Sequence, residues 1–169
     1  MERRNDYTAV IEKYSKVFSD LLANPAQESK LSLGELKKFE RDIDSARKAM
    51  VSKYRVAQGH AADPMPEVTR EEIDQFIQSW NKIDKIVSDA VDYIENDTLG
   101  YSVAEKTIVK HIAENTARDT HRAERVLIMY KRSHKEEELP ELSTAVMASH
   151  KKTLSGISQK ISNIFNRKH

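Results

Sequence analysis

The sequence predicts an all-α protein, an elongated antiparallel bundle of about five helices in a single domain over residues 1–169. Charged residues make up 33% of the chain, whereas glycine and proline occur only four times each, a composition typical of long solvated helices. Apolar residues recur at alternating spacings of three and four along five segments. Three segments begin with a capping box, which marks a helix start. The boxes are Ser32 with Glu35, Thr69 with Glu72, and Ser102 with Glu105.

The breaks between the apolar stripes set the helix limits. Pro25 ends the first helix, because the residue before a proline is pushed out of the α region. Prolines and glycines predict a long loop over 59–68 and a turn over 96–100, and the next break covers residues 134–140, which end at Pro140. The expected helices cover residues 5–24, 32–59, 69–95, 102–133 and 141–166.

These helices are joined by short connections, so each is expected to lie antiparallel to its neighbour in sequence. Stripes with spacings of three and four pack at shallow angles, as in coiled coils, which predicts an elongated shape. Trp80 is expected in the core with Ile77, Ile83 and Val87, which share its helix face.

The helix expected at 102–133 has an apolar stripe that becomes polar in its middle. Counting residues outward from the turns between antiparallel helices places Arg47 and Asp84 at the same height along the bundle axis as this polar interruption. The resulting polar layer comprises Arg47, Asp84, His111, Asn115, Arg118, Asp119 and Arg122. Two interpretations stay open: a structural ion-pair network that fixes the helix register, which is favoured, and a pocket for a small polar or anionic ligand.

Catalytic and metal motifs are sparse. The chain has no cysteine and no Glu-x-x-His pair, and it has neither a glycine-rich phosphate loop nor a nucleophile with a recognisable partner. No catalytic residue, cofactor or metal is therefore predicted. The Arg-x4-His spacing of Arg55 and His60 resembles that of a superfamily of helical ribonucleases, although Val56 replaces the polar residue usual after the arginine.

Charge is unevenly distributed although the net charge is only +1, a balance that argues against a general nucleic-acid binder. All 27 acidic residues lie at or before Glu141, and five of the 28 basic residues follow it. These five form a candidate basic contact surface on the last helix: Lys151, Lys152, Lys160, Arg167 and Lys168. The absence of cysteine, of a signal peptide and of a span-length apolar run predicts a soluble cytoplasmic protein with no membrane span.

These features favour a non-enzymatic interaction module, such as an adaptor, inhibitor, effector or assembly subunit, that binds another macromolecule through its helix faces. A protein is the favoured class of partner. A small-ligand-binding or nuclease-type enzyme with its site in the polar layer stays as the first alternative. Nucleic-acid binding through the basic last helix is the second and is not favoured. Homo-oligomerisation also stays open.

Overall fold

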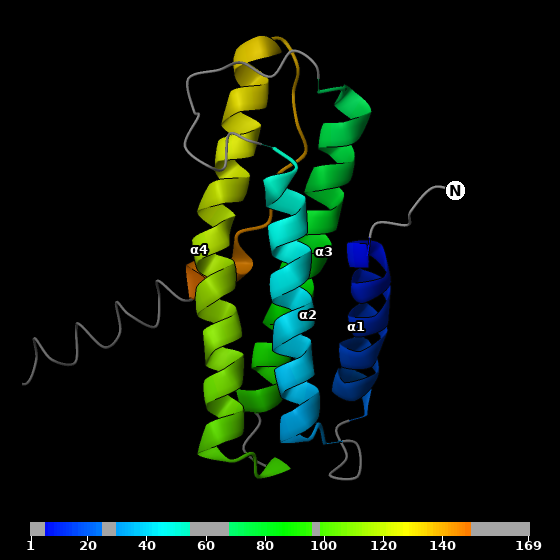
Figure 1. Ribbon diagram of the computed structural model, residues 1–169, viewed down its shortest axis with the longest axis vertical. Coiled ribbons are helices and arrows are strands. Elements are labelled where there is room, and N and C mark those ends of the chain that lie inside the picture. Colours follow the sequence, from blue (N-terminus) through cyan, green and yellow to red (C-terminus); the bar gives the residue numbers. More distant parts are fainter. Residues whose placement is uncertain (1–5, 25–29, 55–67, 96–98, 150–169) are drawn as a thin grey trace, which may run out of the picture.

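The computed structural model describes residues 6–24, 30–54, 68–95 and 99–149. Four long helices dominate this part of the chain, and a fifth helical segment is described over residues 145–149. The long helices are α1 (Asp6–Ala23), α2 (Leu33–Ser52), α3 (Arg70–Glu95) and α4 (Val103–Ser133). Successive helices run in opposite directions along the long axis (Figure 1). The predicted all-α antiparallel bundle is thereby confirmed.

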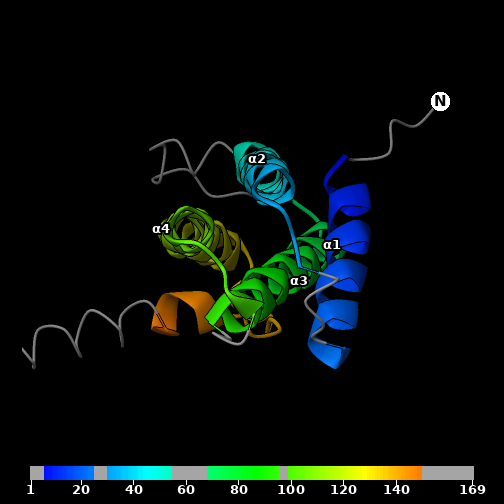
Figure 2. The same cartoon turned by 90° about the horizontal axis from the view of Figure 1, so that it is seen from below.

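Lateral packing differs from the expected order. α2 lies most closely against α4, and α1 lies most closely against α3, whereas α2 and α3 touch only marginally (Figure 2). The expectation that each helix packs beside its sequence neighbour is therefore wrong for α2 and α3. Residues 53–69, which join these two helices, are numerous enough to cross the end of the bundle. Sequence adjacency consequently does not force α2 and α3 together.

Local side-chain chemistry sets the helix starts as predicted. Ser32 and Ser102 each accept a hydrogen bond from the amide three residues later, and Glu35 and Glu105 each bond back to the cap amide. The amide of Glu72 donates to Thr69 Oγ1 at 3.1 Å. Bonds from Ser102 and the positive charge of Lys30 favour the carboxylate of Glu105, and they lower its pKa.

Two helix ends differ from their expected positions. α2 ends at Ser52, well before the predicted end at residue 59. The amide of Tyr54 already donates to the carbonyl of Val51, and the Tyr54 ring packs edge-on against Phe76 of α3, with centroids 5.3 Å apart. Tyr54 is therefore buried against α3 directly after the last turn of α2.

The fifth helical segment starts at residue 145 rather than 141. Asn81 of α3 donates from Nδ2 to the carbonyl of Glu141 and accepts from the amide of Ser143 at Oδ1, at 3.1 and 2.7 Å. The first bond uses the Glu141 carbonyl, which in a helix starting at residue 141 would accept from the amide of residue 145. Residues 141–144 precede the helical segment and are tied to α3 at Glu141 and Ser143.

The core runs the length of the bundle and includes Trp80, which is fully buried. Ile77, Ile83 and Val87 are also fully buried, so the predicted environment of Trp80 is confirmed. The Trp80 ring stacks on Phe76 with centroids 6.3 Å apart. None of the helices in the described ranges has the length and apolar character needed to cross a membrane.

Candidate functional site

Three of the predicted polar-layer residues come together between α2 and α4. Arg47 of α2 is only 1% exposed, and its Nη1 donates to Oδ2 of Asp119 on α4. Arg122 Nη1 lies 3.5 Å from the other oxygen of Asp119. Arg47 Nη2 lies 3.5 Å from Asp44, one turn earlier on its own helix. The result is a buried arginine held by one buried and one half-buried carboxylate.

Asp84 has a different partner from the one expected. Its Oδ2 accepts a hydrogen bond from Ser143 Oγ at 2.7 Å, and the amides of Ala145 and Val146 also favour its charged form. Burial opposes these contacts and is the larger effect, so the pKa of Asp84 is raised. Asp84 thus anchors the chain after α4 to α3, at the start of the fifth helical segment.

The remaining members of the predicted layer lie further out. His111 and Arg118 are exposed, and Asn115 is half-buried. Two threonines omitted from the prediction are instead fully buried: Thr116 donates to the carbonyl of Ile112 and Thr120 to that of Thr116, at 2.7 and 2.8 Å. A threonine hydroxyl that donates to the carbonyl four residues earlier in its own helix needs no hydrogen-bond partner from another helix. Thr116 and Thr120 follow Ile112 at intervals of four residues, which places all three on one face of the helix. This spacing is the sequence signal that could have predicted their burial.

This arrangement offers little chemistry. Asp119 has both oxygens in ion pairs, and Arg47 is enclosed, with only its Nε lacking a partner. Over the described residues, no group of three or more histidine, aspartate or glutamate side chains could hold a metal ion. Arg55, His60 and the predicted basic surface from Lys151 to Lys168 lie outside the described residues.

A second cluster ties the end of α4 to the start of α3. Tyr130 donates to Glu137 at 2.7 Å, and Arg70 of α3 lies 3.8 Å from the other oxygen of that carboxylate. The His134 ring stacks on Tyr130 with centroids 4.0 Å apart. Burial, reinforced by the bond to Glu137, raises the pKa of Tyr130 to about 12. These contacts fix residues 134–139 against the bundle.

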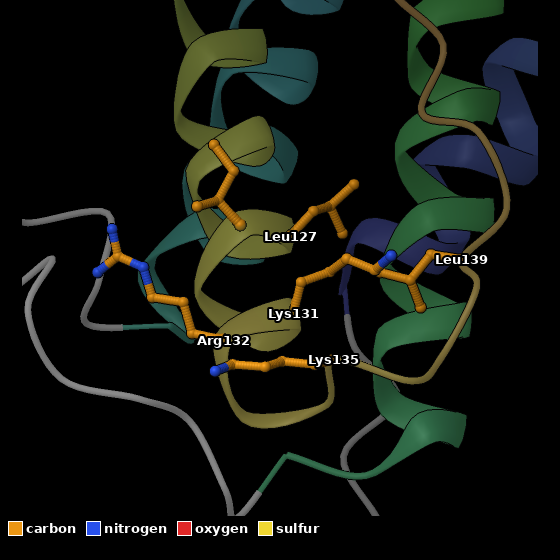
Figure 3. Close-up of a pocket in the computed structure, with 6 residues that line it drawn as sticks. Leu127, Lys131, Arg132, Lys135 and Leu139 are labelled. Atoms are coloured by element: carbon orange, nitrogen blue, oxygen red, sulfur yellow. The ribbon is translucent and has the colours of Figure 1, made fainter.

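An open notch lies between the end of α4 and this fixed segment (Figure 3). Its lining combines apolar and basic side chains: Leu127, Ile128, Lys131, Arg132, Lys135 and Leu139. Leu127 and Lys131 extend from α4 toward Leu139 (Figure 3). Ile128 is 54% exposed, so its apolar side chain is open to solvent at the notch.

The outer side of α4 is basic along its whole length. Its acidic residues are buried (Glu105, Asp119) or half-buried (Glu114, Glu124), whereas all its lysines and arginines are exposed. We call these side chains the basic face: Lys106, Lys110, Arg118, Arg122, Arg125, Lys131 and Arg132. Sequence reasoning missed this face because it followed the apolar stripe and the charges after Glu141.

Comparisons with protein-family models, with curated proteins and with solved structures found no match.

Proposed function

We propose that this chain is a non-enzymatic helical module that binds another protein through the basic face of α4. The observation that carries the proposal is the sign of the exposed charge on α4, where all seven lysines and arginines are exposed and the most exposed acidic side chain is Glu124, at 41%. Solvated helices ordinarily mix both signs, which allows stabilising pairs between successive turns. α3 follows that pattern, with Glu71, Lys82, Lys85, Asp92 and Glu95 all exposed.

Helix stability does not account for the basic face. Basic residues complement the helix dipole only in the last turn, where Lys131 and Arg132 lie. Arg118 and Arg125 lie in the middle of α4, beyond the range of that effect. Like charges on successive turns repel one another, so their accumulation costs stability. A surface kept at such a cost is typical of a binding site for an acidic partner.

The neighbouring helix extends the same charge. α2 packs beside α4, and its exposed acidic residue in the described structure is Glu35. Its exposed basic residues are Lys37, Lys38, Arg41 and Lys48. A positive potential over two adjacent helices speeds the encounter with an acidic protein and disfavours basic ones.

Two features favour a protein over a nucleic acid as the partner. Ile128, near the end of α4, is 54% exposed, and an apolar contact of this kind suits a protein surface. The exposed positions of α4 hold no phenylalanine, tyrosine or tryptophan on which a base could stack. The enzyme alternative has less support, because the charged groups of Arg47 and Asp119 are committed to each other.

The test compares two doubly charge-reversed proteins. Arg118→Glu with Arg125→Glu changes the basic face, and Lys16→Glu with Lys82→Glu makes the same change in charge on exposed positions of α1 and α3. A partner is first identified by pull-down and mass spectrometry from the native host, then purified and titrated against each protein. We expect the first variant to lose at least about tenfold in affinity, and the second to lose much less. Equal losses would contradict the proposal.

A further inference from the structure

We infer that the notch binds an acidic amphipathic helix of the partner, with one leucine-sized side chain against Ile128 and carboxylates beside the notch lysines. The inference rests on the proposed function and adds to it the chemistry of the partner. Leu127, Ile128 and Leu139 supply an apolar floor, and Lys131, Arg132 and Lys135 form a positive rim. This combination suits an apolar anchor that is flanked by acidic residues.

The floor of the notch is held in place before any partner arrives. Glu137 binds Tyr130 and Arg70, and Asn81 holds the backbone at Glu141 and Ser143. Leu139 lies between these two attachment points. A floor that is already ordered avoids the entropy cost of forming on binding.

Helix geometry favours a helical occupant. Arg118, Arg125 and Arg132 recur every seven residues, close to two turns of α4, so their side chains lie in one row. The row from Arg118 to Arg132 extends about 21 Å at 1.5 Å per residue, which about four turns of a partner helix would match. A second helix laid along this row could place acidic residues beside the arginines and one apolar residue in the notch.

Charge excludes two other occupants. The chain's own segment 150–169 carries five basic residues and no acidic residue, so the rim would repel it. A second copy that presents the same surface would bring two basic faces together, which like-charge repulsion disfavours. An acidic segment of another protein is the occupant with complementary charge.

The experiment selects binders from a displayed library of random 16-residue peptides with the full-length protein. The enriched peptides are then labelled and titrated by fluorescence anisotropy at physiological salt. We expect enrichment of peptides that carry several aspartates or glutamates around a leucine, an isoleucine or a phenylalanine. Ile128→Ser should weaken their binding about tenfold, as expected for loss of a central apolar contact. Lys131→Glu with Lys135→Glu should weaken it at least as much.

Val103→Ser is the matched control, because it removes an exposed apolar side chain at the far end of the same helix. Circular dichroism confirms that each variant is folded. Failure to enrich any peptide, enrichment of neutral or basic peptides, or equal effects of Ile128→Ser and Val103→Ser would overturn the inference. Tighter binding of a duplex DNA than of the peptides in the same assay would also overturn it, in favour of a nucleic-acid partner.

The purified natural complex separates the two proposals. If Arg118→Glu with Arg125→Glu disrupts that complex and the notch variants do not, the inference about the notch fails and the proposed function stands. If neither set of variants disrupts it, both fail. Disruption by both sets supports both.

Discussion

Removing Asp119 tests whether the contact between α2 and α4 is a structural ion pair. The Arg47 guanidinium is 1% exposed, so it cannot turn to solvent when its main partner is lost. Two unit charges about 4 Å apart attract by about 4 kcal/mol at an effective dielectric constant of about 20. Asp44, at 3.5 Å and half-buried, compensates only part of that loss. We expect Asp119→Leu to lower the free energy of unfolding by about 3 to 5 kcal/mol.

Replacing both charges should cost much less. Arg47→Met with Asp119→Leu leaves no buried charge without a partner, and Asp44 keeps its salt bridge to Lys48 at 2.8 Å. We expect a change of about 1 kcal/mol or even a gain, because apolar side chains of similar volume avoid the desolvation cost. Lys48→Met is the control, because this lysine is 68% exposed and its ion pair should contribute less than about 1 kcal/mol.

The assay is urea unfolding followed by far-ultraviolet circular dichroism. The unmodified protein, Arg47→Met, Asp119→Leu, the double variant and Lys48→Met are all measured at one pH and salt concentration. A double variant as unstable as the sum of its two single variants would refute the ion-pair reasoning. So would a cost of less than about 1 kcal/mol for Asp119→Leu alone. A stable Asp119→Leu variant that had lost a measured activity would instead favour a ligand pocket, since functional sites are commonly held at a cost in stability.

Three further predictions concern the rest of the bundle. Burial raises the pKa of Asp84 above its ordinary value of 3.8. The folded state therefore holds the carboxyl proton of Asp84 more tightly than the unfolded state does. The stability that this difference contributes is lost as pH rises through the raised pKa. The free energy of unfolding of the unmodified protein minus that of Asp84→Asn should therefore fall as pH rises from about 3.8, and a rise would contradict this assignment. Ser102→Ala removes the cap of α4 and should cost about 1 kcal/mol in urea unfolding, whereas an unchanged midpoint would show that the cap is dispensable. Duplex DNA titrated at physiological salt should bind with micromolar or weaker affinity, and a nanomolar dissociation constant would promote the nucleic-acid alternative.

The predicted polar layer shows how far heights along a bundle can be deduced from sequence. Hairpin lengths placed Arg47 near Asp119 and Arg122, and these three residues do meet. The same reasoning assigned Asp84 to this group, whereas Asp84 binds Ser143. Height along the axis follows from counting residues between turns. The direction in which a residue faces across the bundle depends on which helices are neighbours, and counting does not supply that.

The sequence by itself determined the number, type and starts of the long helices, because stripe spacing and capping boxes act within a few residues of each other. The cap at Ser102 forms from residues three apart, and no other part of the chain is needed. Only the tertiary structure decided that α2 lies against α4, which turns Asp119 inward onto Arg47. The sequence of α4 mixes acidic and basic residues, and packing buries Glu105 and Asp119 but none of the basic ones. The basic face is therefore a product of burial, which depends on contacts between residues far apart in the chain.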